Sequence, residues 1–189
     1  YLGLCAIGTD LTERKAAEGA LRASEEQFKL LIEHAPDAIV LFDLDLNVFI
    51  SANTAAERIF GRSRAELLHC SVLDFSPPLQ PDGHTSADKA REHLAATVAG
   101  ATQPFEWHYQ RPDGRIVIGE TRLLLLPHPN RTLIRGSVTD ITERKTAEAA
   151  VRISEERFRI VAEQTGQMIF DQDLLTGNRV WAGATATII

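Results

Sequence analysis

The sequence contains few of the residues that build disulfide frameworks or membrane spans. Its 189 residues include two cysteines, Cys5 and Cys70, which lie far apart and lack the spacing of metal ligands. This usage favours a reducing cytosol over a disulfide framework. No apolar run approaches the roughly 20 residues needed to cross a bilayer, and no segment resembles a signal peptide. We therefore expect a cytoplasmic chain without direct membrane contact in these residues, with an upstream membrane anchor as an open alternative.

Signatures of nucleic-acid binding and of catalysis are also absent from the sequence. The formal net charge is −6, and lysine and arginine are mixed with glutamate instead of forming a basic block, so no nucleic-acid partner is expected. None of the six histidines has the spacing of a zinc or nucleophile motif, and no glycine-rich phosphate loop occurs. The sequence therefore predicts no catalytic site and no metal site, and any enzymatic output has to lie outside residues 1–189.

The clearest feature that is present is an internal repeat. Residues 10–15 read DLTERK and residues 140–145 read DITERK, and the match continues without a gap to Phe28 and Phe158. A self-match at a fixed offset indicates an array of similar modules. With 44% hydrophobic and 24% charged residues, the composition is that of a folded soluble protein. The two copies of the repeat leave room for one complete module between them.

Five segments follow from this repeat. Residues 1–10 are predicted to be the last strand of a preceding module, and residues 166–189 the truncated start of a following one. Residues 35–140 are predicted to form the complete domain, with connector helices at residues 11–34 and 141–165. The chain is therefore expected to be a piece of a longer array.

Each connector helix is predicted to begin at a capping box. Asp10 lies three residues before Glu13, a spacing at which each side chain pairs with a backbone amide of the first helical turn. Asp140 and Glu143 repeat this spacing. Asp140, Thr142 and Glu143 are candidate signal-relay residues, because a cap shared between the last strand and the helix couples the domain to the direction of the helix. A purely structural capping role is the alternative.

Both connectors carry an apolar seam with alternating steps of four and three residues. The seam consists of Leu21, Phe28 and Leu31 in the first copy and Val151, Phe158 and Val161 in the second, with alanine and serine between them. This is the a/d spacing of a coiled coil, and glutamate and arginine fill the flanks. We predict that two chains pair in parallel through these seams as a homodimer. The alternative is that each helix lies on the sheet of its own domain.

Within residues 35–140, apolar periodicity and turn residues predict an α+β domain. Strands are expected at residues 38–43, 48–51, 105–109, 116–126 and 132–139, and helices at residues 53–61, 64–69 and 86–99. Asn53 is expected to cap the first helix, and Ser63 with Glu66 the second. Two hairpins separated by helices predict one antiparallel sheet with the helices gathered on one face.

Four short motifs occur in order along this part of the chain. They are residues 53–57 (NTAAE), 60–68 (FGRSRAELL), 111–114 (RPDG) and 139–145 (TDITERK). Together with the order of elements, they resemble the PAS sensor family with its C-terminal PAC segment, and residues 166–189 resemble the start of another PAS module. The resemblance implies a PAS fold, with a five-stranded antiparallel sheet and short helices that enclose a small cavity for ligands, cofactors or partners. It also implies a signalling parent such as a two-component histidine kinase, a diguanylate cyclase or a phosphodiesterase.

A set of aromatic and polar residues forms the candidate ligand site. Its members are Phe42, Asn53, Trp107, Glu120, Arg122 and Arg135. Trp107 shares a strand face with two other aromatics, which suits either the cavity or an outer sheet face under a connector helix. Glu120 and Arg122 share a face and either orient a polar ligand or lie in solvent. If Asn53, Arg122 and Arg135 lie on the cavity face, the expected ligand is a small carboxylate or another polar metabolite.

No cofactor is assigned from the sequence. Some PAS proteins hold haem through a histidine on the long helix, but Arg91, and not His93, lies nearest that position, so haem is not expected. Light-sensing relatives bind flavin covalently through a cysteine in a particular helix motif. Cys70 falls about two positions early and lacks the asparagine and glutamine partners of that motif. A non-covalent flavin served by Trp107 and Asn53 is a minor alternative.

The motifs, the repeat and the apolar seams together predict one function. Residues 1–189 are expected to be a non-catalytic sensory and dimerisation module of a cytoplasmic signal transducer. The module would sense a small molecule in the PAS cavity and relay the signal through the connector helices to a downstream kinase or cyclic-di-GMP output domain. The alternative is a protein-interaction scaffold with a filled core and no ligand.

Overall fold

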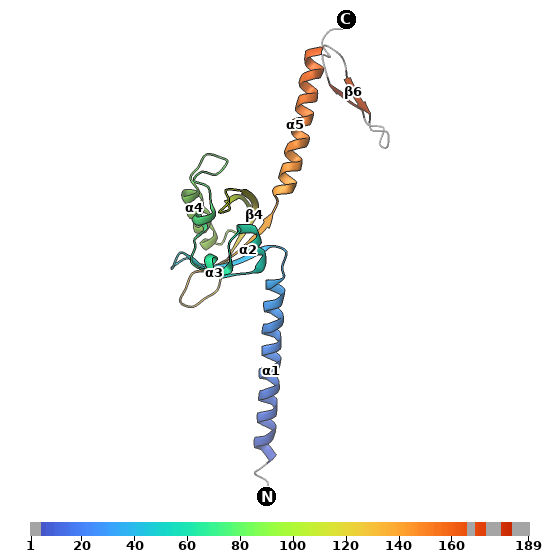
Figure 1. Cartoon of the computed structure of the whole chain (residues 1–189). Coiled ribbons are helices and arrows are strands. Elements are labelled where there is room, and N and C mark those ends of the chain that lie inside the picture. Colours follow the sequence, from blue (N-terminus) through green and yellow to red (C-terminus); the bar gives the residue numbers. More distant parts are fainter. Residues whose placement is uncertain (1–4, 166–168, 173–178, 183–189) are drawn as a thin grey trace. The chain divides into compact units, whose positions relative to one another are not determined.

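The computed structural model describes residues 5–165, 169–172 and 179–182, and the side chains of residues 14–160 (Figure 1). The chain divides into two compact units, Tyr1–Ile141 and Thr142–Ile189. The first unit contains α1 (Cys5–Glu33), β1 (Ala38–Asp43), β2 (Val48–Ala52), α2 (Thr54–Phe60), α3 (Arg64–Leu67), the 3-10 helix η1 (Val72–Phe75), α4 (Ser86–Val98), β3 (Phe105–Gln110), β4 (Ile116–Leu126) and β5 (Leu133–Asp140). The second contains α5 (Thr142–Thr165), β6 (Ile169–Gln172) and β7 (Arg179–Ala182). None of the described helices is long and apolar enough to cross a bilayer.

The first unit is built on a five-stranded antiparallel sheet with the strand order β2-β1-β5-β4-β3. The register places Gly136 of β5 opposite Val40 of β1 and Leu123 of β4. These residues line an interior space together with Phe60 of α2 and Ala90 of α4, so the helices between β2 and β3 lie on one face of the sheet (Figure 1). The predicted α+β fold with a five-stranded antiparallel sheet is confirmed.

Aromatic rings connect the helices to the sheet. Phe49 of β2 contacts Phe42 of β1 at a ring-centroid distance of 5.3 Å and Phe75 of η1 at 5.6 Å. Phe60 of α2 contacts both Phe75 and Tyr109 of β3, each at 5.1 Å. Stacked and edge-to-face contacts at such separations are favourable beyond the burial of apolar area. The rings therefore tie the two edge strands and the short helices into one core.

The short helices begin and end at the predicted capping residues. Asn53 precedes α2 and its side chain accepts a hydrogen bond from a backbone amide of the first turn, and Gly61 ends the helix in the left-handed conformation with a φ of 68°, which glycine adopts without steric cost. Ser63 and Glu66 form the predicted capping box of α3. α3 ends two residues earlier than expected, and η1 after it had no separate signal in the sequence.

The start of the chain differs from the prediction. Residues 5–9 were expected to form a strand, but α1 runs without a break from Cys5 to Glu33, and residues 1–4 lie outside the described part. Asp10 is therefore inside the helix and does not cap it. A strand needs a neighbour to pair its backbone amides and carbonyls, whereas a helix pairs them within the segment, so a short β-prone stretch joined to a strong helix former continues that helix.

The second unit contains the second copy of the connector helix and a hairpin. α5 begins at Thr142, two residues after the end of β5 at Asp140. The strands β6 and β7 pair in antiparallel fashion, with Phe170 opposite Trp181. A hairpin was expected here as the start of a following module, and that assignment stays a prediction.

Candidate ligand cavity

A small cavity lies between the inner face of the sheet and the helices. Its volume is about 60 Å³, and its walls come from all strands of the sheet together with α2, η1 and α4. Phe42 and Trp107, two of the predicted ligand-binding residues, line it. Both side chains are almost completely buried. The structure thus decides which way the aromatic face of β3 points, because Trp107 and Tyr109 lie on the cavity side and not on the outer face of the sheet.

The cavity lining is almost entirely apolar, and its main polar feature is a pair of buried hydroxyls. The Tyr109 hydroxyl and Thr121 Oγ1 are 2.7 Å apart and form a hydrogen bond. Tyr109 and Thr121 are each only 4% exposed, and burial raises the pKa of Tyr109 far above its ordinary value. Both hydroxyls are therefore neutral and protonated at physiological pH, so the cavity carries hydrogen-bonding groups but no anion.

An imidazole forms part of the wall between α4 and β3. His93 stacks flat on Phe105, with ring centroids 3.6 Å apart and an interplanar angle of 5°. Burial, and then the positive charge of Lys89, lower the pKa of His93, while Glu92 acts in the opposite direction. The ring is therefore neutral at pH 7. Since His93 and Phe105 are both only partly buried, their stack separates the cavity from solvent.

Trp107 is held by a hydrogen bond that fixes its ring against the cavity. Its indole Nε1 donates to Ser76 Oγ over 3.0 Å, and Ser76 Oγ donates to the carbonyl of Val72 over 2.7 Å. A buried indole N–H needs such a partner. The hydroxyl relay therefore joins the wall formed by β3 to η1.

Two strand glycines shape the cavity, and sequence reasoning missed both. A Cβ at Gly119 would lie 2.5 Å from Val138 Cγ1 and 2.7 Å from Tyr109 Cε2, and a Cβ at Gly136 would lie 3.0 Å from Val40 Cγ2. A side chain at position 119 would push Tyr109 out of its place. A glycine inside an otherwise apolar strand is the signal that could have identified these positions, since it often marks a close approach of neighbouring groups.

Asn53 does not line the cavity, although it was predicted to bind ligand. Its side-chain oxygen accepts hydrogen bonds from the amides of Ile39 (2.9 Å) and Ala56 (3.0 Å), and its nitrogen donates to the carbonyls of Ile32 (2.9 Å) and Asp37 (3.0 Å). The side chain is 2% exposed, and these four bonds use its full capacity. Asn53 therefore joins the end of α1 to β1 and α2.

The charged members of the predicted site lie on the other face of the sheet. Thr121 and Ile134 line the cavity, and successive strand residues point to opposite faces, so Glu120, Arg122 and Arg135 point away from it. Arg122 and Arg135 are exposed, and Arg122 lies 3.5 Å from Glu120 in an ion pair. The structure therefore does not bring Asn53, Arg122 and Arg135 onto the cavity face, and the cavity lacks the cations on which the hypothesis of a carboxylate ligand depended.

The cavity in this arrangement does not fit a large ring cofactor. Pockets for drug-sized ligands measure roughly 300–1,000 Å³, several times the volume observed here. Arg91, which lies nearest the position expected for a haem ligand, is exposed and pairs with Asp88 at 2.9 Å. Cys70 is buried outside the lining, with Arg62 Nη1 3.8 Å from its Sγ, and burial raises the pKa of its thiol. No group of three potential metal-ligating side chains occurs within the described residues.

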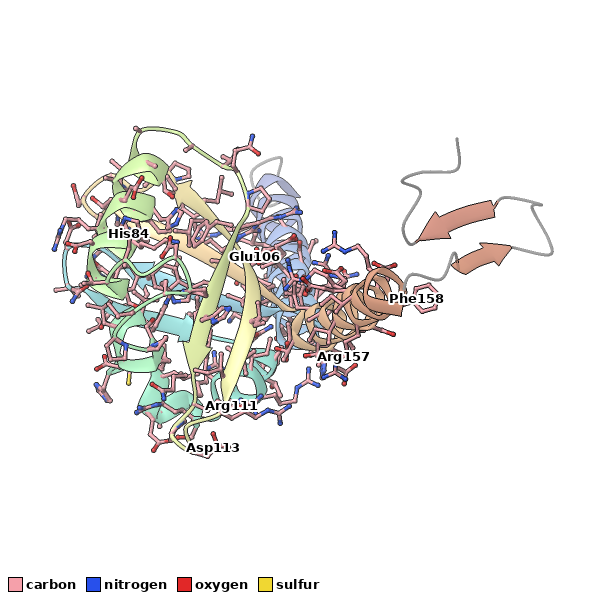
Figure 2. All side chains as sticks on the ribbon, turned by 90° about the horizontal axis from the view of Figure 1, so that it is seen from above. His84, Glu106, Arg111, Asp113, Arg157 and Phe158 are labelled. Carbon is pink, nitrogen blue, oxygen red and sulfur yellow. The ribbon has the colours of Figure 1, made fainter. Side chains whose placement is uncertain are left out.

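The apolar seam of α1 is not covered by its own domain. Leu21, Phe28 and Leu31 are 62%, 63% and 66% exposed. Leu30 is not part of the seam; it lines an open groove between α1 and the rest of the domain, together with Glu33 and Arg64. The alternative that α1 lies with its seam on its own sheet is therefore wrong for this structure. In α5, Val151 is also exposed, as is Phe158 (Figure 2). The side chain of Val161 lies outside the described part.

The fold, the cavity and the closing strand-to-helix junction agree with one family. A family model described as a PAS fold matches residues 32–146. The chain belongs to the PAS fold family. Among solved structures, the PAS domain of an HTR-like protein from Haloarcula marismortui gives a TM-score of 0.57 at 23% identity and covers 67% of this chain and 99% of that domain. At 23% identity, this similarity shows a shared fold only.

Relatives of this PAS domain in sequence include sensor kinases. The sensor protein FixL of Bradyrhizobium diazoefficiens is 34% identical over 83 residues, which cover 44% of this chain and 16% of FixL. Sporulation kinase E of Bacillus subtilis is 28% identical over 165 residues, which cover 82% of this chain and 20% of the kinase. The chain spans a fifth or less of the length of these two relatives.

Proposed function

We propose that this PAS domain is a non-catalytic sensory and dimerisation module of a cytoplasmic signal transducer. In this proposal a small molecule occupies the cavity, and the change is relayed through α1 and α5 to a kinase or cyclic-di-GMP output domain elsewhere in the parent protein. The similarity to segments of sensor kinases supports this place in a signalling chain. Within the described residues, the support comes from the connection between the cavity wall and α1.

The hydrogen bonds of the Asn53 side chain are the main support for the proposal. The side-chain nitrogen of Asn53 donates a hydrogen bond to the carbonyl of Ile32 in α1, and its side-chain oxygen accepts one from the backbone amide of Ile39 in β1. The neighbouring strand residues Val40 and Phe42 line the cavity, as does Phe60 at the other end of α2. A ligand that moves β1 or α2 therefore alters the hydrogen bonds that hold the end of α1, and such a shift between two arrangements is what a relay requires.

A second set of contacts ties the same end of α1 to the short helices. Glu33 accepts a hydrogen bond from the Thr54 hydroxyl and lies 3.5 Å from Arg64 in an ion pair. Both partners sit at the beginning of a helix, Thr54 in α2 and Arg64 in α3. These exposed contacts are individually weak, but they repeat the connection made by Asn53.

Two chains pair through the exposed seam of α1 in this proposal. We expect Leu31→Lys to shift the sedimentation profile of the chain toward monomer, because a buried charge at a d position is costly. Leu30→Lys is the matched control, since Leu30 is also exposed, at 58%, but faces the groove instead of the seam. A wild-type chain that stays monomeric at high concentration, or equal effects of the two substitutions, would remove pairing from the proposal.

A scaffold with a filled core is the second candidate function. The observation in its favour is the small volume of the cavity, about 60 Å³, since a water molecule occupies roughly 30 Å³ in the liquid. Native mass spectrometry of the purified chain separates the two candidates. A small molecule that co-purifies supports the sensor. A bare chain in every preparation that is also not stabilised by any added small metabolite in a thermal-shift screen supports the scaffold.

A further inference from the structure

The two buried hydroxyls of the cavity contain one hydrogen-bond donor more than they use. Tyr109 and Thr121 each carry one hydroxyl hydrogen, and each oxygen can also accept. One hydrogen forms the 2.7 Å bond between them, with either atom as the donor. The second hydrogen has no acceptor among the residues that the structure describes. Because both groups are buried, this unused donor favours a ligand that brings an acceptor into the cavity.

The remainder of the lining restricts the ligand to a neutral molecule. The walls around the hydroxyls are aliphatic and aromatic side chains such as Val40, Leu94 and Trp107. His93 is the titratable side chain of the wall toward solvent, and its stacking on Phe105 keeps it among apolar groups. An ion placed here would lose its hydration without a charged partner in the lining, which is strongly unfavourable.

The volume sets the size of the ligand. A cavity of about 150 Å³ in another protein holds the six carbons of benzene, about 25 Å³ for each atom, whereas one water-sized sphere fills only about 15 Å³. A volume of about 60 Å³ therefore corresponds to roughly two to four non-hydrogen atoms. Water by itself is a poor occupant, since an ordered buried water typically needs two to four polar partners and the hydroxyl pair is the main polar group here.

We propose that the cavity binds a small neutral molecule of two to four non-hydrogen atoms with one hydrogen-bond acceptor, such as a short aldehyde or ketone. The acceptor oxygen receives the free hydroxyl hydrogen of the Tyr109–Thr121 pair, and the alkyl part contacts the aliphatic and aromatic walls. This inference rests on the proposed sensory function and names the class of its ligand. It replaces the carboxylate expected from the sequence by a molecule of similar size without charge.

Acetone and acetate provide a matched test, because they have the same number of non-hydrogen atoms and differ in charge. Each is titrated into the whole chain while the indole N–H of Trp107 is followed by ¹H–¹⁵N NMR. The chain has two tryptophans, and Trp181→Phe assigns the signal. We expect acetone to shift the Trp107 signal in a saturable way, with a dissociation constant on the order of millimolar for so small a ligand, and acetate to leave it unchanged.

Two variants test the site itself. Tyr109→Phe/Thr121→Val removes both hydroxyls while keeping the shape of the cavity, a double replacement that is nearly neutral for folding, and should weaken acetone binding about tenfold. Ala90→Val adds two methyl groups to the wall and should abolish binding. If circular dichroism shows that Ala90→Val does not fold, Gly136→Ala is used in its place. The Cβ of Gly136→Ala would lie 3.0 Å from Val40 Cγ2 and would reduce the cavity from the sheet side.

The outcomes separate this inference from the proposed function. A shift with acetate and none with acetone would overturn the ligand class but leave a sensory cavity. Equal acetone affinity in the wild type and the double variant would overturn the role of the hydroxyl pair. If neither molecule shifts Trp107, the inference is wrong, and the sensory function fails with it only if native mass spectrometry also finds no bound molecule.

Discussion

At the scale of single residues, Asn53 shows how one side chain can serve as a structural joint. Its four hydrogen bonds connect backbone groups of α1, β1 and the first turn of α2. Its most distant partner, Ile32, lies 21 positions from Asn53 in the chain. Because the side chain is almost fully buried, each partner that loses its bond is left without one or has to rearrange.

We predict that Asn53→Ala lowers the free energy of unfolding by about 2–4 kcal/mol, because it leaves several buried backbone groups unpaired and removes the cap of α2. Equilibrium urea unfolding followed by circular dichroism measures the change. Asn130→Ala, at an exposed position in the loop before β5, is the matched control and should stay within about 0.5 kcal/mol. A loss below 1 kcal/mol for Asn53→Ala would show that the joint is not needed for stability.

His93 makes the stability of the domain depend on pH. Burial and Lys89 lower its pKa in the folded state from an ordinary value of 6.5, against the opposing effect of Glu92. As the pH falls below 6.5, the unfolded chain takes up a proton before the folded one does, so the unfolded state is favoured. We therefore expect the free energy of unfolding to decrease between pH 6.5 and the lower folded pKa, and to be unaffected by this group above pH 6.5.

The comparison of the wild type with His93→Phe isolates this effect, because phenylalanine can stack on Phe105 without titrating. Urea unfolding at a series of pH values should give a shallower decrease below pH 6.5 for the variant. Some slope is expected to remain, since burial also lowers the pKa of His108. Identical pH profiles of the two proteins would contradict the assignment to His93.

At the scale of elements, the hairpin between β3 and β4 holds the end of a helix. Arg111 lies at this hairpin (Figure 2), and its Nε donates to the carbonyl of Ile59 over 2.8 Å and its Nη2 to the carbonyl of Arg58 over 2.7 Å. These carbonyls belong to the last turn of α2, where a helix has unpaired acceptors and the negative end of its dipole. The motif of residues 111–114 therefore has a structural role in addition to forming a turn.

We predict that Arg111→Ala destabilises the domain by about 1–3 kcal/mol, because two charge-assisted hydrogen bonds to the helix end are lost. Arg115→Ala changes an exposed arginine of the same hairpin and should have almost no effect. Thermal unfolding of both variants gives the comparison. Equal melting temperatures for the two variants would mean that solvent replaces Arg111 at the end of α2.

The elements of residues 35–140 also show where local sequence patterns are sufficient to predict strands and helices. The strands and helices of residues 35–140 follow the predicted order because each is bounded by its own signals, such as the Asn53 cap and the left-handed Gly61. The error at residues 5–9 has a physical cause: whether a short apolar stretch becomes a strand depends on a neighbouring strand, which local pattern cannot supply.

At the scale of the whole molecule, β5 leads directly into the second connector helix. β5 ends at Asp140, Ile141 is buried and donates its amide to the carbonyl of Ile118 over 2.9 Å, and α5 begins at Thr142. The backbone at this junction is therefore tied to β4, two residues away from Glu120. Asp140, Thr142 and Glu143 stay predicted relay residues.

We predict that Asp140→Ala leaves the domain folded but removes ligand-dependent output in the full-length parent protein. The fold is checked by the Trp107 indole signal, and the output by the activity of the parent with and without ligand. Thr139→Ala, one residue earlier and also exposed, is the control and should keep its response. Unchanged ligand-dependent output in Asp140→Ala would argue that Asp140 only stabilises the junction.

The sequence by itself determined the order of strands and helices in residues 35–140, because hydrophobic periodicities and turn residues are local signals. The array of modules that the repeat indicates stays a prediction. Two of the site residues that the sequence singled out, Phe42 and Trp107, line the cavity. Tertiary structure decided the rest of that site. A period of two shows that Glu120 and Arg122 share one face and Thr121 the other, but it does not show which face is covered by helices. Only the packing of α4 and η1 over the sheet put the Tyr109–Thr121 hydroxyls inside and the charges outside, and only the approach of α1 to β1 turned Asn53 from a ligand candidate into a joint.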